Sequence, residues 1–160
     1  MRFHHVCLIV SNLERAIGMW TTLFDFKLDQ QFVAPDAAMA SAPDSTFLQL
    51  LEDIWGIKEA RTNVALLSSP GGALLELQEP ITPSVQLLPK NFMTYNSTGI
   101  REICFHVQDI DNWFEKVKAH GYRLQTDYVW PVNNQSRTFM FHDDDGHLIQ
   151  LWESPDATAW

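Results

Sequence analysis

Four polar residues, His5, Glu76, Glu102 and Gln150, interrupt apolar stretches of this 160-residue sequence. An imidazole, two carboxylates and an amide oxygen are nitrogen and oxygen donors, and this set suits divalent ions such as Zn, Ni, Co, Fe, Mn or Mg. Two carboxylates would also offset the charge of a buried ion. Taken singly, each residue has a simpler explanation, as a hydrogen-bonded strand histidine or a polar group on a half-exposed sheet. Their spacing favours a shared site.

The spacing follows an internal repeat. The stretch FHHVCLIVSNLERAIGMW lies over IREICFHVQDIDNWFEKV at an offset of 97 residues, and His5 falls on Glu102. The stretch VALLSSPGGALLELQE lies over TFMFHDDDGHLIQLWE at an offset of 74, and Glu76 falls on Gln150. Two matches in the same order indicate a duplicated unit. Each copy has the pattern of a strand, a helix and further strands, so we expect two βαβββ modules.

We expect a single domain made of these two modules. Its parts are module one at residues 1–80, a bridge at 81–98 and module two at 99–155, within 1–160. Glycine-containing turns at 70–72 and 145–146 predict a hairpin that closes each module. Module one has an extra segment, in which we expect a strand near Phe47–Leu51 and then a surface excursion at Trp55 and Gly56.

Each predicted helix has end signals. Ser11 and Glu14 have the spacing of a capping box before the apolar period of the first helix. Asp109 is the expected cap of the second helix, and Gly121 suits its end.

Strand alternation predicts which side chains share a face. Val6 and Leu8 should pack against the helix, and His5 should lie on the opposite face. Leu75 and Leu77 similarly oppose Glu76. The same alternation applies to the second copy, so the four polar residues would converge in one cleft if the two half-sheets meet. His4 is expected on the helix side of its strand, without a catalytic role, and His147 in solvent.

Composition excludes several classes of protein. The net charge is −9, which argues against binding to nucleic acid, because phosphates require a clustered positive surface. No apolar run approaches the roughly 20 residues of a membrane helix, and the apolar stretch near the N-terminus is too short for a signal peptide. We therefore expect a cytoplasmic protein without membrane contact. Cys7 and Cys104 lie in apolar strands and are expected to be free thiols.

With these motifs the sequence resembles the vicinal oxygen chelate superfamily, which includes glyoxalase I, methylmalonyl-CoA epimerase, extradiol dioxygenases, and fosfomycin and bleomycin resistance proteins. The matching stretches are FHHVCLIVSNLERAIGMW, PGGALLELQEP, TGIREICFHVQDID and DDDGHLIQLWE. The resemblance implies an α+β fold, in which paired βαβββ modules form a curved, mixed, mostly antiparallel cleft around a metal, and it implies a homodimer.

The resemblance also implies roles for the four polar residues. His5 looks like the first metal ligand and Glu76 like the second. Glu102 occupies a place where histidine is common, and Gln150 one where glutamate is common. A two-histidine iron centre is disfavoured by these departures, so a ring-cleaving dioxygenase ranks low. Isomerase, epimerase or lyase chemistry of the glyoxalase type fits better, with proton abstraction next to a carbonyl by Glu102, our preferred base, or by Glu76.

Other residues are expected to line the cleft around a small, fairly apolar substrate. Apolar walls are expected from Trp55, Phe92, Tyr95, Trp130 and Met140, and polar contacts from His106 and His142. Core or interface packing is the simpler explanation for the aromatic residues. The competing function is a metal-free small-molecule binding or antibiotic-resistance protein, followed by a metal-free cyclase or isomerase that uses Glu102 and His106.

Overall fold

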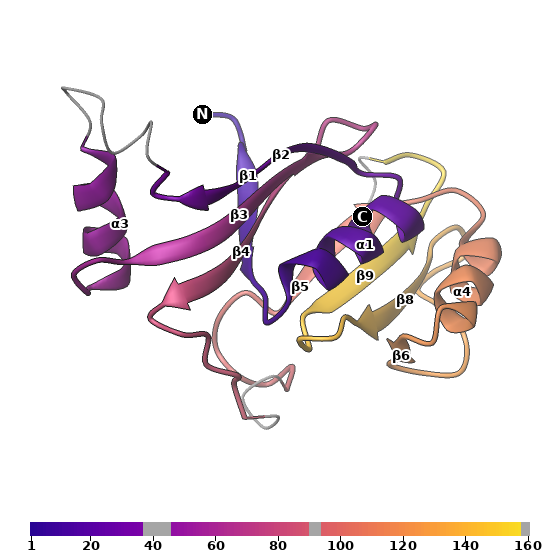
Figure 1. The fold of residues 1–160 in the computed structure, drawn as a ribbon. Coiled ribbons are helices and arrows are strands. Elements are labelled where there is room, and N and C mark those ends of the chain that lie inside the picture. The colour runs from indigo at the N-terminus through magenta and orange to yellow at the C-terminus, as the bar shows by residue number, and fades with distance from the viewer. Residues whose placement is uncertain (37–45, 90–93, 158–160) are drawn as a thin grey trace. The chain divides into compact units, whose positions relative to one another are not determined.

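The structure is a computed structural model that describes residues 1–36, 46–89 and 94–157 (Figure 1). The chain divides into two compact units, Met1–Leu87 and Leu88–Trp160, and the division lies within the predicted bridge. From here on, module one denotes Met1–Leu87 and module two denotes Leu88–Trp160, which extend the predicted modules to include the bridge. None of the helices in the described ranges has the length and apolar character that crossing a membrane requires.

Module one is a four-stranded sheet with helices packed on it. Its elements in chain order are β1 (His5–Ile9), α1 (Leu13–Leu23), β2 (Lys27–Ala34), α3 (Phe47–Trp55), β3 (Arg61–Ser68) and β4 (Leu74–Thr82). The strand order is β1-β4-β3-β2, in which β1 and β4 are parallel and the other pairs antiparallel.

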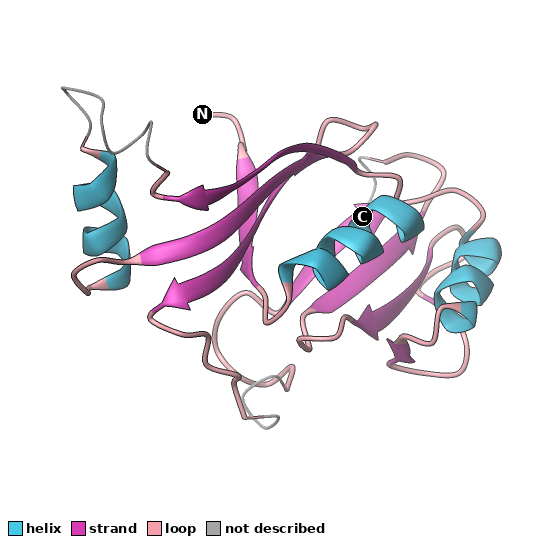
Figure 2. Cartoon of the chain, viewed as in Figure 1, coloured by secondary structure: helices cyan, strands magenta, loops and turns pink. Residues whose placement is uncertain are grey.

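Module two repeats this plan with shorter strands (Figure 2). Its elements are β5 (Glu102–His106), α4 (Ile110–Ala119), β6 (Arg123–Leu124), β7 (Trp130–Pro131), β8 (Arg137–His142) and β9 (Leu148–Glu153). The order is β5-β9-β8-β6, with β7 paired to β8; β5 and β9 are parallel and the other pairs antiparallel.

The structure confirms the predicted α+β fold with mixed sheets. β1 and β5 begin and end 97 residues apart, and β4 and β9 begin 74 residues apart, as the two sequence offsets require. The ladder is also conserved between the copies, because Cys7 pairs with Glu76 in β1–β4 and Cys104 pairs with Gln150 in β5–β9.

The predicted strand faces are visible in β1. In β1, Leu8 is buried and Val6 half-buried, whereas His5 is exposed. In module one the helix-facing core contains Trp20, which has no exposed surface and whose ring centre lies 5.1 Å from that of Phe24. These aromatic and aliphatic groups contribute most of the free energy that holds α1 on its sheet.

Two local predictions in module one were wrong. The cap of α1 is Asn12, whose Oδ1 accepts the Arg15 backbone N–H at 2.9 Å, and not Ser11. Residues Phe47–Leu51 begin helix α3 instead of forming a strand, and Gly56, with a φ of 66°, ends that helix in a left-handed conformation. A short apolar run satisfies both strand and helix periods, and here the glycine stop and the packing of one helix face decide for the helix.

Helix α3 packs on the β2–β3 side of the sheet. Its Leu51 joins a buried cluster with Ala34 and Val64, and Phe47 and Trp55 pack against that cluster. Val64 and Leu66 pair with Gln78 and Glu76 in the β3–β4 ladder. Because paired residues of antiparallel strands share a face, the cluster lies on the same face of the sheet as Glu76.

Both closing hairpins form at the predicted turns. In module two Asp143 accepts the backbone N–H groups of Asp145 and His147 through Oδ1, at 3.0 and 2.8 Å. The prediction that His147 is solvated was wrong, because its Nδ1 lies 2.8 Å from Asp143 Oδ2 and its side chain is mostly buried. Burial opposes protonation of this ring, yet the hydrogen bond and charge of Asp143 raise the pKa of His147.

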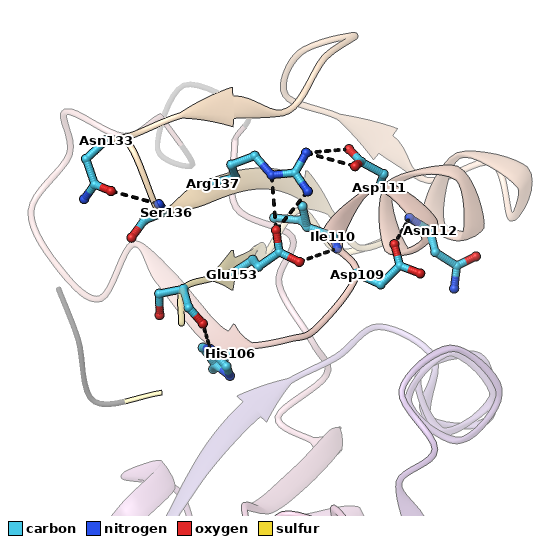
Figure 3. A network of polar contacts seen from close by, with 10 residues as sticks. His106, Asp109, Ile110, Asp111, Asn112, Asn133, Ser136, Arg137 and Glu153 are labelled. Atoms are coloured by element: carbon cyan, nitrogen blue, oxygen red, sulfur yellow. Dashed lines mark hydrogen bonds and ion pairs between the residues drawn. The ribbon is translucent and has the colours of Figure 1, made fainter. Parts of the chain in front are cut away.

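The start of α4 is held by an ionic network (Figure 3). Asp109 caps the helix as predicted, through Asn112 N. Glu153 of β9 accepts the Ile110 backbone N–H at 3.1 Å and the Arg137 guanidinium at 2.9 and 3.1 Å. Although burial opposes ionisation of Glu153, the hydrogen bonds from Arg137 and Ile110 lower its pKa. The network therefore ties α4 to β8 and β9.

We predict that Glu153→Gln lowers the free energy of unfolding by about 1 kcal/mol at pH 7, the size of a charge-assisted hydrogen bond discounted for partial exposure. Because the pKa of Glu153 is lower in the folded state, its contribution is present above its unfolded pKa of about 4.3 and is lost as pH falls through the folded value. Urea unfolding at pH 7 and at acidic pH measures this. Glu115→Gln, on the exposed side of α4, is the control, and a pH-independent difference between Glu153→Gln and the original protein would contradict the prediction.

Candidate functional site

In module one, His5 and Glu76 come together on the sheet face opposite α1. His5 Nε2 lies 3.2 Å from Glu76 Oε2. The parallel β1–β4 ladder sets Cys7 opposite Glu76, so His5 is the diagonal neighbour of Glu76 on the same face. Gln78, two residues further along that face, donates from Nε2 to Glu76 Oε1 at 2.6 Å. One carboxylate oxygen is thus held by Gln78 and the other faces His5.

The second ring nitrogen of His5 also has a partner. His4 Nδ1 lies 2.7 Å from His5 Nδ1, with the rings edge to face at 5.0 Å between centres. His4 was expected to lie away from the site, so sequence reasoning missed this contact. A metal-binding histidine is commonly oriented by a hydrogen bond to its other nitrogen, and His4 occupies that place for His5.

The geometry of this pair suits metal binding. Two ligand atoms bound to one ion at about 2.1 Å lie roughly 3.0–3.4 Å from each other, and the His5–Glu76 separation falls in that range. An imidazole nitrogen and a carboxylate oxygen are donors that Zn, Mn, Fe, Co and Ni accept. Module one therefore presents two of the predicted ligands in a suitable arrangement.

In module two, Glu102 and Gln150 lie on neighbouring strands and on one face. Glu102 pairs with Leu148, and Gln150 with Cys104, in the parallel β5–β9 ladder. Glu102 Oε2 accepts a hydrogen bond from the Tyr95 hydroxyl at 3.2 Å. The negative charge of Glu102 raises the pKa of Tyr95, so the phenol stays protonated at neutral pH. Tyr95, predicted as an apolar wall, is in fact a hydrogen-bond donor to the predicted base.

Gln150 is the most enclosed of the four predicted ligands. Its residue surface is only 8% exposed. Its Nε2 donates to Thr138 Oγ1 at 2.9 Å, and that hydroxyl donates to the Leu151 carbonyl at 2.8 Å. Thr138 was not among the residues singled out from sequence; the signal that could have found it is strand alternation, which sets it on the same face as Gln150.

The other residues of module two that are predicted to contact the substrate lie in different places. Met140 pairs with Gln150, and Trp130 pairs with Thr138, so both lie on the Gln150 face. His106 Nε2 lies 3.0 Å from the Ser154 carbonyl oxygen. Phe92 lies outside the described residues.

His142 is held inside module two. It is 7% exposed, with its ring nitrogens 3.0 Å from Gln125 Oε1 and 3.3 Å from the Gly146 carbonyl oxygen. Burial lowers the pKa of His142, so it is neutral at pH 7. These contacts favour a structural role for His142 over the predicted substrate contact.

Trp55 belongs to the apolar cluster around Leu51 of α3, which we call the α3 cluster and which extends toward the His5–Glu76 pair. It packs against the buried residues Leu51 and Val64, and the partly buried Leu66 packs on the same cluster. Leu66 is the cross-strand neighbour of Glu76. The sheet face next to Glu76 is therefore continued by apolar side chains, which is the surface that an apolar substrate group needs.

The described part of the chain contains no larger cluster of metal-binding side chains. Within residues 1–36, 46–89 and 94–157, no three His, Cys, Asp or Glu side chains gather closely enough to hold a metal ion. An open cavity of about 360 Å³ in module one is lined by Leu13, Gln31, Phe32, Val33 and Asn63. None of the predicted ligands lines this cavity, so we do not assign the chemistry to it.

A cysteine lies beside the ligands on each site face. Burial raises the pKa of the Cys7 thiol to about 12, and the charge of Glu76 adds to the effect. Burial likewise raises the pKa of Cys104 to about 11, with a contribution from Glu102. Both thiols are therefore protonated at neutral pH and are weak nucleophiles, although part of each residue reaches the surface.

Comparisons with known proteins agree with this architecture. The sequence model of the Glyoxalase/Bleomycin resistance protein/Dioxygenase superfamily matches residues 2–151. No curated protein has a sequence that matches this chain. Among solved structures, a glyoxalase family protein from Bacillus cereus is similar with a TM-score of 0.78 and 21% identity, over 96% of this chain and 94% of that one.

Two further solved structures share the fold at lower similarity. The fosfomycin resistance protein FosX from Listeria monocytogenes has a TM-score of 0.63 and 18% identity, over 96% of this chain and 93% of its own. A glyoxylase/bleomycin resistance protein/dioxygenase domain from Frankia has a TM-score of 0.64 and 16% identity, over 96% and 98%.

We predict that Glu76→Gln increases the alkylation rate of Cys7 and leaves that of Cys104 unchanged. Removal of the Glu76 charge lowers the pKa of the neighbouring thiol and increases its thiolate fraction. Iodoacetamide labelling at pH 8, followed by peptide mass spectrometry, gives both rates in one sample, so Cys104 is the internal control. Equal acceleration of both cysteines would indicate general loosening of the fold instead.

Proposed function

Because the chain belongs to the Glyoxalase/Bleomycin resistance protein/Dioxygenase superfamily, we propose that it is a metal-dependent isomerase, epimerase or lyase of the glyoxalase type. The proposed reaction is proton abstraction next to a carbonyl group of a small, fairly apolar substrate. The observation that carries the proposal is the 3.2 Å approach of His5 Nε2 to Glu76 Oε2, which matches the spacing of two ligands on one ion.

The proposal assigns two metal ligands to each module: His5 and Glu76 in module one, Glu102 and Gln150 in module two. Crystals of the Listeria FosX have been solved in complex with Mn(II), which supports a divalent ion as the cofactor here. A bound divalent ion supplies a Lewis acid for the substrate oxygen and stabilises the negative charge that develops as the proton leaves.

Glu102 is the proposed base. A base must present an oxygen to the substrate proton within hydrogen-bonding distance. Tyr95 donates to Oε2 of Glu102, so Oε1 is the oxygen that would bind the metal and, when released from it, would take the proton. The hydrogen bond from the Tyr95 hydroxyl would hold the carboxylate in this orientation.

The apolar part of the substrate is assigned to the surfaces that border the ligands. The α3 cluster continues the Glu76 face, and Met140 and Trp130 lie on the Gln150 face. The proposal includes a homodimer in the cytoplasm; exposed apolar groups on the outer side of α3, Leu50 and Ile54, support an interface with a second copy.

We predict that the purified protein binds a divalent ion. The His5→Ala, Glu76→Ala double variant should lose its affinity for that ion. The loss should exceed the roughly 10–100-fold effect of removing an outer-shell partner, because two direct ligands are removed. Elemental analysis and titration calorimetry with Mn(II) measure it. His120→Ala, which removes a histidine on α4, is the matched control. Equal affinity of the double variant and the original protein would refute the ligand assignment.

We also predict that the protein catalyses exchange of a carbon-bound proton next to a carbonyl with deuterium oxide. Proton NMR on a panel of small aldehydes, ketones and acids with apolar side chains detects the exchange. Glu102→Gln should reduce the rate by about 10²–10⁴-fold, the typical contribution of a general base. The exposed Glu115→Gln is the control. Full turnover by Glu102→Gln would eliminate Glu102 as the base.

A second candidate function is small-molecule sequestration or antibiotic resistance without a metal. It is favoured by the hydrogen bonds that already engage Glu102 and Gln150, and by the absence of a three-residue ligand cluster within the described ranges. The metal analysis separates the two candidates, because this one requires no divalent ion for ligand binding.

A further inference from the structure

The amide of Gln150 is oriented by a hydrogen-bond chain inside module two. Thr138 is 5% exposed and Gln150 is 8% exposed, so most of each residue is shielded from water. The Thr138 hydroxyl carries a single hydrogen, which it donates to the Leu151 carbonyl oxygen at 2.8 Å. Toward Gln150, at 2.9 Å, the hydroxyl oxygen can therefore only accept.

This requirement fixes which end of the amide faces Thr138. An amide has a donating NH₂ group and an accepting oxygen, and only the NH₂ group satisfies an acceptor. Nε2 of Gln150 is consequently directed at Thr138, and Oε1 is directed away from it. Among the described residues, no hydrogen bond to Oε1 of Gln150 is found, and this oxygen is not one of the fully buried atoms that lack a partner, so it reaches the surface and is open to another partner.

The orientation matters for metal binding, because an amide coordinates through oxygen and its NH₂ group has no lone pair to offer. We propose that Thr138 is a positioning residue that selects the oxygen of Gln150 as the ligand atom. This inference rests on the proposed metal site and deepens it: the second module supplies a neutral oxygen ligand that is set in place before the ion arrives.

Module one provides an internal contrast. The ligand equivalent to Gln150 there is Glu76, a carboxylate whose two oxygens can both bind a metal. The residue equivalent to Thr138, at the offset of 74, is Val64, which cannot accept a hydrogen bond. A hydroxyl acceptor is therefore present in the module whose ligand needs orienting and absent from the module whose ligand does not.

The first test uses the protein without added metal. Selective ¹⁵N labelling of glutamine gives the side-chain NH₂ signals of Gln150, assigned with Gln150→Ala. In the original protein and in Thr138→Ser these protons should exchange slowly with water, because they are hydrogen-bonded within a buried site. In Thr138→Val they should exchange at least tenfold faster. Unchanged exchange in Thr138→Val would overturn the inference.

The second test measures Mn(II) affinity by calorimetry in a double-mutant cycle. Thr138→Val should weaken binding roughly tenfold, as expected for an outer-shell partner, and Thr138→Ser should restore it. In a Gln150→Glu background, Thr138→Val should have little effect, because both carboxylate oxygens can bind a metal and no hydrogen-bond acceptor is needed to orient them. If Thr138→Val does not fold, Thr138→Ala replaces it in the double-mutant cycle.

The outcomes separate this inference from the proposed function. Equal weakening by Thr138→Val in both backgrounds would show a general structural role and overturn the inference. Unchanged Mn(II) affinity in Thr138→Val, with loss in Gln150→Ala, would overturn it while leaving the metal site intact. Absence of metal binding by the original protein would refute the proposed function, and the exchange measurement would still decide the amide orientation.

Discussion

The parallel pairing of the first and last strand in each module is the constraint on which the rest of the structure depends. Parallel strands require a crossover, and in each module this connection begins with a helix, α1 or α4, that packs on one face of the sheet. Polar side chains are thereby confined to the other face. The register sets Cys7 opposite Glu76, and this alignment brings His5 within 3.2 Å of a carboxylate that lies 71 positions later in the numbering.

The two modules share the strand pairing but differ in their predicted metal ligands and in the side chains that contact these ligands. Glu76 is held by Gln78, and His5 is in contact with His4. In module two a tyrosine hydroxyl engages Glu102, and a threonine engages Gln150. Duplication preserved the backbone pairing, because ladder hydrogen bonds do not depend on side-chain identity, while the groups that orient each ligand changed with the ligand.

The segment that interrupts module one changes the surface next to the ligands. Helix α3 covers part of the face that carries Glu76, and its cluster reaches Leu66 beside that residue. A sheet face that would otherwise be open to solvent is therefore partly apolar. This arrangement gives module one an apolar border close to two polar ligands, the combination that small-molecule sites use for affinity and orientation.

The sequence by itself determined the repeat, the opening strand and helix and the closing hairpin of each copy, and the common strand face of His5 and Glu76. These features follow from local periodicity, since side chains alternate along a strand and recur along a helix regardless of what lies nearby. They were enough to identify His5 and Glu76 as partners. Residues Phe47–Leu51 show the limit of this reasoning, because a short apolar run fits both periods, and the helix is decided by the Gly56 stop together with the packing of Leu51.

Tertiary structure decided which polar groups meet. The burial of His142 and its contact with Gln125 depend on backbone positions that no local pattern specifies. The Tyr95–Glu102 and Thr138–Gln150 contacts are of the same kind. Hydrogen bonds require donor and acceptor within a few tenths of an ångström, and that precision arises only when strands, turns and helices are packed together.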